Sequence, residues 1–198
     1  RDIEALTLYS FSTENWGRPG DEVDALMALL ARYLIDERDE LMENSVRLRG
    51  IGQLERLPPQ VRMLLDEATR LTADNEGLLL TLALSYGSRA EIVEAVQAVA
   101  RKVAAGELAP EDIDDQVITD HLYTVGTPDP DLLIRTSGEM RLSNFLLWQL
   151  AYAELYVTDV YWPDFREPHL DVALEAYARR QRRFGRTSAQ LGEGEQAS

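Results

Sequence analysis

The segment at residues 135–144 gathers side chains well suited to binding a phosphate. It contains two arginines six residues apart, Arg135 and Arg141, with hydroxyl-bearing residues and a glycine between them. Each guanidinium can donate two parallel hydrogen bonds to phosphate oxygens, and the hydroxyls and a free backbone amide could bind the remaining ones. This chemistry suits a diphosphate. The alternative is that both arginines form surface ion pairs with neighbouring acids, and the residue types alone leave both interpretations open.

A second polar loop follows the first strand-like run and extends from Ser12 to Pro19. It places a hydroxyl (Ser12), an amide (Asn15), an indole (Trp16) and a guanidinium (Arg18) within seven residues. Such a set could hold an anion together with an apolar group. The other interpretation is a capped turn that leads into the next helix, with Trp16 covering the core.

One carboxylate, Glu154, stands in a mostly apolar segment at residues 150–157. A buried carboxylate must be paired, protonated or bound to a cation, because an isolated buried charge is costly. A magnesium ion, which prefers oxygen ligands, and a salt bridge to an arginine are both open. The acids at 111–115 lie in the most acidic part of the chain, and we assign them to a helix N-terminus rather than to a metal.

The composition indicates one acidic globular domain rather than a disordered chain. The 198 residues carry 20 Lys+Arg against 35 Asp+Glu, a formal net charge of −15. This charge opposes binding to nucleic acid, which requires clustered basic residues. The absence of cysteine excludes disulfides and thiolate metal sites, so any metal must be held by oxygen. No run of 18 apolar residues and no signal-peptide pattern occurs, and we therefore expect a cytoplasmic protein.

The elements that would position these loops alternate between strand and helix. Apolar β-branched runs predict strands, and apolar residues at helical spacing predict helices. Strands are expected at 3–10, 46–52, 78–84, 132–134 and 155–157, and helices at 21–44, 58–71, 89–104, within 107–120 and at 170–184. This order predicts an α/β fold, a single-domain parallel β-sheet flanked by helices, in which ligands bind beyond the carboxyl ends of the strands.

Four motifs taken together resemble the cis-prenyltransferases, in particular the bacterial undecaprenyl diphosphate synthases. The resemblance extends from about residue 3 to residue 187, and its motifs are Ser12 to Pro19, Asp131 to Asn144, Trp148 to Tyr156 and Trp162 to Phe165. That family joins an allylic diphosphate, usually farnesyl diphosphate, to successive isopentenyl diphosphates with cis double bonds, using Mg²⁺. The resemblance implies a long-chain product of the undecaprenyl class for the lipid carrier of cell-wall synthesis. It also implies a cytoplasmic homodimer with peripheral membrane contact for product release.

The resemblance assigns the diphosphate of isopentenyl diphosphate to Arg135, Arg141 and Ser143, in agreement with the first interpretation of residues 135–144. It makes Glu154 the residue of this chain that contributes to Mg²⁺ binding.

The loop at 12–19 receives a catalytic role through Ser12 and Asn15, which fall where the family keeps polar groups near the reacting carbons. The C-terminal run at 177–186 contains five arginines and no acid. Such a run is most often a solvated or ion-paired helix face, but it also suits phosphate or subunit contact. Part of it resembles the family's Arg-x-Gly signature, which reaches a diphosphate across the dimer interface. The further substrate-binding residues implied are Trp16, Arg18, Arg183 and Gly185.

One family motif, Asp-Gly-Asn-Gly-Arg-Trp-Ala, does not occur in these residues. It supplies the metal-binding aspartate and the allylic diphosphate loop. Because the sequence begins at Arg1 rather than at Met, almost within a strand, we expect an N-terminally truncated chain that is itself inactive. The expected organisation is a cis-prenyltransferase domain over 1–187, lacking its first strand and phosphate loop, and a disordered tail over 188–198. A smaller departure is Met140, where many members carry His.

The alternative function is that of a non-catalytic partner subunit with the same fold, which would stabilise a catalytic chain. Such partners commonly lose groups of the active site. The presence of Arg135, Arg141, Ser143 and Glu154 therefore argues against this alternative.

The expected length of the product is inferred mainly from one small residue. In the family, the growing chain threads a tunnel between the sheet and the helix expected at 21–44, and short-product members place a bulky residue near the end of the strand at 3–10. Here that position is Ser10, between Tyr9 and Phe11. The resemblance therefore implies an open tunnel and a long product.

Overall fold

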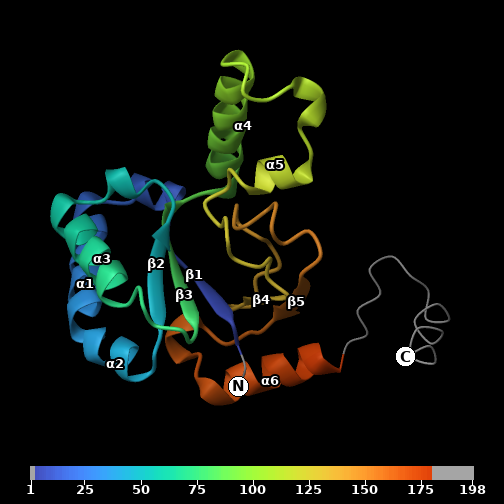
Figure 1. Cartoon of the computed structure of the whole chain (residues 1–198). Coiled ribbons are helices and arrows are strands. Elements are labelled where there is room, and N and C mark those ends of the chain that lie inside the picture. The colour runs from blue at the N-terminus through green and yellow to red at the C-terminus, as the bar shows by residue number, and fades with distance from the viewer. Residues whose placement is uncertain (1–2, 180–198) are drawn as a thin grey trace. The chain divides into compact units, whose positions relative to one another are not determined.

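The structure is a computed structural model that describes residues 3–179 (Figure 1). Its strands are β1 (Ala5–Ser12), β2 (Arg47–Ile51), β3 (Leu79–Tyr86), β4 (Leu132–Arg135) and β5 (Glu154–Val157). Its α-helices are α1 (Gly20–Asp36), α2 (Arg38–Glu43), α3 (Pro59–Leu71), α4 (Ser88–Ala104), α5 (Asp115–Thr119) and α6 (Glu167–Ala178). The described residues form two compact units, 3–128 with 143–148, and 129–142 with 149–179.

Each unit contains its own parallel sheet. In the first unit the strand order is β1-β3-β2, and in the second β4 pairs with β5. Six of the eight residues of the central strand β3 are buried, in agreement with the prediction of a strand covered on both faces. The predicted parallel α/β architecture is thus confirmed, with the strands divided between two sheets.

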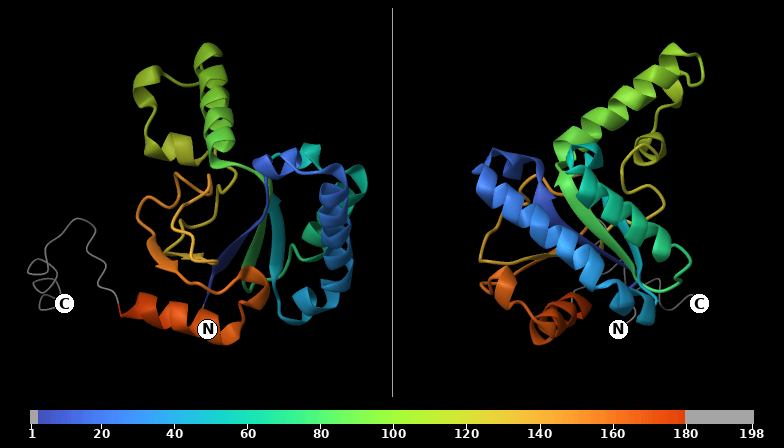
Figure 2. Two further views of the ribbon diagram at one scale, coloured as in Figure 1. Left: turned by 180° about the vertical axis from the view of Figure 1, so that it is seen from behind. Right: turned by 90° about the vertical axis from the view of Figure 1, so that its left-hand side faces the viewer.

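The core of the first unit lies between its sheet and two helices. Helices α1 and α3 lie side by side along one face of the sheet (Figures 1 and 2). Val23, Met27 and Leu34 from the predicted apolar face of α1 are buried against Leu65 and Ala68 of α3. Each large apolar side chain buried in this way contributes about 1.5–3 kcal/mol to folding. This layer holds the sheet whose carboxyl end carries the loop at 12–19.

The prediction of one continuous helix over 21–44 is wrong. The helix ends at Asp36, Glu37 has φ −91° and ψ 3°, and a second helix, α2, begins at Arg38. The regular apolar spacing of α1 stops after Leu34, so no buried stripe extends the first helix. Arg38 also donates from Nε to the Leu34 carbonyl, which satisfies one of the carbonyls left open at a helix end.

In the second unit, α6 packs against β5. This helix begins at Glu167, three residues before the predicted start, and the predicted end at residue 184 lies outside the described residues. The domain extent of 1–187 stays a prediction, and the tail at 188–198 also lies outside the described residues. Within residues 3–179, no helix is both long enough and apolar enough to cross a membrane.

Candidate functional site

In the first unit, strands β1 and β3 end side by side, because Ser12 pairs with Tyr86 in parallel register. β1 continues into a 3₁₀ helix, Thr13–Gly17, and β3 continues through Gly87 into α4. The polar loop at 12–19 therefore lies at the carboxyl end of the sheet, where ligands bind in parallel α/β folds.

Asn144 ties three segments of this unit together. Its Oδ1 accepts a hydrogen bond from the Arg89 backbone N–H at 2.9 Å, and its carbonyl accepts one from Ser88 N–H at 2.8 Å. These are open N–H groups of the α4 N-terminus. The Asn144 Nδ2 donates to Glu14 Oε1 at 3.0 Å. Gly87 makes this approach possible, because a Cβ at that position would lie 2.8 Å from the Asn144 Nδ2.

The backbone that carries Ser143 is strained. Ser143 and Asn144 have φ values of 52° and 61°, in the left-handed region that non-glycine residues seldom occupy. The Tyr9 hydroxyl donates to the Ser143 carbonyl at 3.4 Å. Strain of this kind persists where surrounding contacts impose it, and it concentrates at functional sites. Here the contacts of Asn144 impose it.

Ser12 and Asn15 are held by a local hydrogen bond, in which the Ser12 backbone N–H donates to Asn15 Oδ1 at 2.9 Å. Within residues 3–179, no acceptor takes the side-chain N–H groups of Asn15, so they are available to a ligand. Beside them stands the ionised carboxylate of Glu14. Burial raises the pKa of Glu14, but hydrogen bonds from Asn144 and from neighbouring hydroxyls outweigh it, and the pKa lies below its ordinary value.

Trp16 and Arg18 make contacts that explain their positions without a ligand. The Trp16 Nε1 donates to Ser85 Oγ at 2.9 Å, and its ring packs edge to face on Phe11. Arg18 donates from Nη1 to Glu22 Oε1 at 2.6 Å, with both side chains close to half exposed. The core-covering interpretation of Trp16 thus has direct support, and the binding roles of Trp16 and Arg18 stay predictions.

A buried carboxylate, Glu91, supports the same end of the sheet. Only 1% of Glu91 is exposed, and it accepts hydrogen bonds from the Tyr86 hydroxyl at 2.5 Å and from the Tyr123 N–H at 2.8 Å. Burial, and then the charge of Glu91, raise the pKa of Tyr86 far above its ordinary value. Tyr86 therefore stays a hydrogen-bond donor that fixes the end of β3.

In the second unit, Arg135 and Arg141 converge on one carboxylate. Arg141 Nη2 lies 2.5 Å from Glu139 Oε1, and Arg135 Nη2 donates to the other oxygen, Oε2. The ion-pair interpretation therefore has direct support, and the diphosphate interpretation stays a prediction. The arginines do pair with a neighbouring acid, and that acid brings the two guanidinium groups together.

The turn that separates these arginines is held by the segment that follows β5. The Ser137 N–H donates to the Val160 carbonyl and the Gly138 N–H to the Thr158 carbonyl, each at 2.9 Å. Gly138 has φ +66°, and a Cβ there would meet Asp159 Oδ1 at 2.8 Å. A residue with a side chain would disturb the turn, which explains the glycine at this position.

Glu154 begins β5, where its backbone N–H donates to the Asp131 carbonyl at 2.9 Å. Glu154 is half-buried, which is less burial than its apolar surroundings predicted. Within the described part of the chain, no three acidic or histidine side chains gather closely enough to hold a metal ion. A single carboxylate is nevertheless compatible with Mg²⁺, which commonly takes one or two protein carboxylates and completes its shell with phosphate oxygens and water.

The structure brings together some of the predicted site residues. Ser12, Asn15, Trp16, Arg18 and Ser143 belong to the first unit, and Arg135, Arg141 and Glu154 to the second. Arg183 and Gly185 lie outside the described residues. The sequence interpretation did not identify Glu14, Gly87, Glu91, Glu139 or Asn144. A local signal exists only for Glu139, which stands four residues after Arg135 and two before Arg141.

Comparisons with known proteins identify the family of this chain. The family model described as "Putative undecaprenyl diphosphate synthase" matches residues 1–185. An isoprenyl transferase of Porphyromonas gingivalis is 53% identical over 189 residues, which are 96% of this chain and 74% of that protein. An isoprenyl transferase of Geobacillus kaustophilus is 54% identical over 187 residues, covering 94% of this chain and 73% of that protein.

Two solved structures share the fold. The lavandulyl diphosphate synthase of Lavandula x intermedia, in complex with dimethylallyl diphosphate, aligns with a TM-score of 0.90 and 42% identity, over 92% of this chain and 79% of that one. A probable undecaprenyl diphosphate synthase of Campylobacter jejuni aligns with a TM-score of 0.80 and 36% identity, over 92% and 84%. The match of nearly the whole chain in both sequence and fold places this protein in the undecaprenyl diphosphate synthase family, and it is a cis-prenyltransferase.

Proposed function

We propose that the protein condenses isopentenyl diphosphate with an allylic diphosphate, with farnesyl diphosphate as the primer, to give a long-chain cis-polyprenyl diphosphate of the undecaprenyl class. The observation that carries this proposal is the convergence of Arg135 and Arg141 on the carboxylate of Glu139. Two guanidinium groups that share one anion are suited to share another. In the overall reaction, a carbon–carbon bond forms between the two substrates, the carbon–oxygen bond of the allylic substrate breaks and releases inorganic diphosphate, and isopentenyl diphosphate loses one proton.

In this proposal the diphosphate of isopentenyl diphosphate replaces Glu139 as the partner of the two arginines. The hydroxyl of Ser143, two residues after Arg141, adds a further donor. Ser12 and the unused N–H groups of Asn15 act near the reacting carbons. Trp16 and Arg18 contact the allylic substrate.

Mg²⁺ is the cofactor that we propose, and Glu154 is the side chain of this chain that would contribute to its binding. When bound, the ion would neutralise diphosphate charge. The protein would act as a cytoplasmic homodimer that supplies a lipid carrier for cell-wall synthesis and touches the membrane for product release. Arg183 and Gly185 would act across its interface. The alternative, a non-catalytic partner subunit, has no support from the comparisons.

The proposal is tested by incubating the full-length enzyme with farnesyl diphosphate, radiolabelled isopentenyl diphosphate and Mg²⁺. We expect labelled polyprenyl diphosphate. Its absence, while the primer and isopentenyl diphosphate both still bind, would favour the partner subunit.

For Glu154→Gln we expect activity to fall while thermal stability stays nearly constant. The substitution keeps the size of the side chain and removes the charge that a cation requires. Activity at increasing Mg²⁺ concentration and the melting temperature should be measured together. Glu175→Gln, which removes an exposed ion pair with Arg179 in the same unit, is the control and should change neither. A large loss of melting temperature, with activity recovered in the cold, would instead support a structural salt bridge.

For Ser10→Leu we expect shorter products. Ser10 is the extra residue of an irregular step in β1, between Tyr9 and Phe11, and it is exposed. A larger side chain can be accommodated there without displacing core residues, so the expected effect is obstruction of the product path rather than unfolding. Chromatography of the radiolabelled products compares wild type, Ser10→Leu and the small control Ser10→Ala. A short wild-type product, or an unchanged length distribution in Ser10→Leu, would contradict the proposed chain length.

A further inference from the structure

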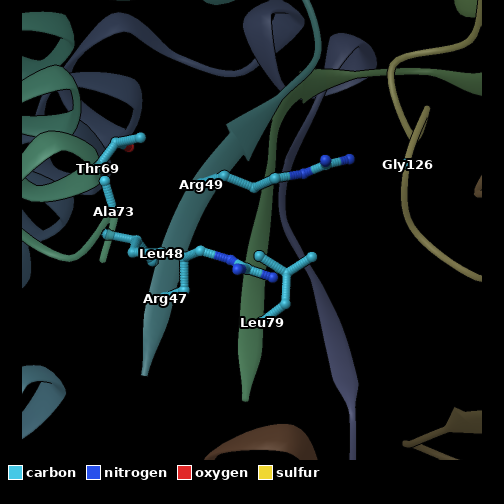
Figure 3. A pocket seen from close by; sticks show the side chains of 7 residues that line it. All are labelled: Arg47, Leu48, Arg49, Thr69, Ala73, Leu79 and Gly126. Carbon is cyan, nitrogen blue, oxygen red and sulfur yellow. The ribbon is translucent and has the colours of Figure 1, made fainter. Parts of the chain in front are cut away.

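A cavity of about 270 Å³ lies at the edge strand of the first unit, away from the loops described above. It is lined by Arg47, Leu48, Arg49, Thr69, Ala73, Leu79 and Gly126 (Figure 3). Arg47 and Arg49 pair with Leu79 and Thr81 of β3, whereas Ser12 is level with Tyr86. At about 3.3 Å per residue, at least ~17 Å of strand separates the two levels.

Two arginines on the same face of β2 line this cavity. Residues 47 and 49 alternate with Leu48, which is buried in the core on the helix-covered face. Figure 3 shows both side chains reaching across β3, Arg47 toward Leu79 and Arg49 toward the segment that contains Gly126. Their Cα atoms are about 7 Å apart, a separation from which two long side chains can reach both phosphoryl groups of one diphosphate.

The positive charge of this pair is not neutralised within residues 3–179. Arg47 makes no side-chain ion pair or hydrogen bond there. Arg49 donates only to backbone carbonyls, to Tyr123 at 3.0 Å and to Val125 at 3.4 Å. Burial, and then the charge of Arg47, lower the pKa of Arg49. An anion in the cavity would relieve both effects.

Several buried polar atoms near these arginines also lack a partner. The Arg49 Nε is buried without an acceptor. Thr81, the cross-strand neighbour of Arg49, is only 1% exposed, and its Oγ1 makes no hydrogen bond. The Oγ1 of Thr127, next to Gly126, is also buried without a hydrogen-bond partner. Buried polar groups are nearly always paired with protein, water or ligand, and of these residues Arg49 lines the cavity, so an acceptor in the cavity would supply the partner that its Nε lacks.

We propose that this cavity binds a diphosphate group, with Arg47 and Arg49 as its cationic ligands. Two forked guanidinium groups match the oxygens of a diphosphate, and Thr69, which lines the cavity, can add a hydroxyl donor. The diphosphate could be the inorganic anion that each condensation releases or the head group of a prenyl diphosphate, whose first carbons would meet Leu48, Ala73 and Leu79.

The test is isothermal titration calorimetry of the full-length enzyme without metal, using inorganic diphosphate and, separately, farnesyl diphosphate. The background variant is Arg135→Ala/Arg141→Ala, which removes the proposed binding site for isopentenyl diphosphate. Arg47→Gln is the main variant, because the Arg47 side chain has no hydrogen bond or ion pair to lose within residues 3–179. Arg62→Gln, on the exposed side of α3, is the control for net charge.

We expect Arg47→Gln to weaken binding on the order of tenfold through loss of one charge-assisted contact, with no change for Arg62→Gln. The probe that shows the larger effect identifies the source of the diphosphate. Arg49→Lys keeps the charge but loses the planar guanidinium that donates two parallel hydrogen bonds, and it should weaken binding less than Arg47→Gln does.

If Arg47→Gln and Arg49→Lys both leave the affinities for the two probes unchanged, the cavity holds only water and the inference is wrong. The background variant separates this result from a failure of the proposed function. Comparison of this variant with the wild type measures the contribution of Arg135 and Arg141 to diphosphate binding, independently of Arg47 and Arg49.

Discussion

Gly52→Ala should destabilise the first unit by about 3 kcal/mol or more. Gly52 follows β2 with φ +116°, a conformation that residues with side chains rarely adopt. A Cβ there would lie 2.1 Å from the Leu84 carbonyl oxygen. Because that oxygen belongs to the backbone of the central strand, no rotamer change can relieve the clash. For a chain of this size the loss corresponds to about 6–12 °C in melting temperature.

The effect should reach the candidate site through β3. The N–H of Gln53, next to Gly52, donates to the Ser85 carbonyl at 3.2 Å, and Ser85 in turn holds the Trp16 indole. Denaturant unfolding and activity should therefore be measured on the same variant. Gly20→Ala is the matched control, because a Cβ at Gly20 would have no neighbour within 4 Å and the residue lies in α1. Alanine should be neutral or slightly stabilising there. Equal stability of the two variants would show that β2 and β3 can separate at Gly52 without cost.

The sequence was sufficient to predict most elements, because their signals are local. The spacing of Val23, Met27 and Leu34 predicted the buried face of α1, and the continuous apolar run of β3 predicted a strand covered on both faces. The end of α1 at Asp36 was missed because apolar spacing lapses there without a proline or glycine to mark it. The order β1-β3-β2 and the division into two sheets depend on pairing between strands that are distant in the sequence. A single sequence contains no local pattern that predicts such pairing.

The same distinction holds for the candidate site. Ser12, Asn15, Arg135 and Arg141 were identifiable because several polar residues stand close together in the sequence after apolar runs. Asn144 was not singled out, because its partners Glu14 and Arg89 are 130 and 55 residues away. A residue that acts by joining distant segments leaves no local pattern, and only the folded chain identifies it.

The pairing around Glu139 leads to the second large effect, which concerns substrate binding. In the full-length enzyme, Arg141→Ala should raise the KM for isopentenyl diphosphate about 10- to 100-fold and leave the KM for the allylic substrate nearly unchanged. A charge-assisted pair between a guanidinium and a phosphate is worth about 1.5–3 kcal/mol, which corresponds to that range. Arg135→Ala should have an effect of the same kind, and because both arginines contact Glu139, the two substitutions should not be additive.

A substitution at Glu139 distinguishes two roles that this carboxylate could have, which the alanine variants of the arginines do not separate. If Glu139 occupies the arginines only until substrate arrives, Glu139→Gln should keep or lower the KM for isopentenyl diphosphate, because it removes a competing anion. If Glu139 instead orients the arginines, the same substitution should raise that KM as Arg141→Ala does. Arg32→Ala, which breaks an exposed pair with Asp36 in α1, is the control and should leave both KM values unchanged. Steady-state kinetics with each substrate varied in turn measures all four variants. An equal rise in both KM values for Arg141→Ala would contradict the assignment of these arginines to isopentenyl diphosphate, because a general disturbance of the site would then explain the loss.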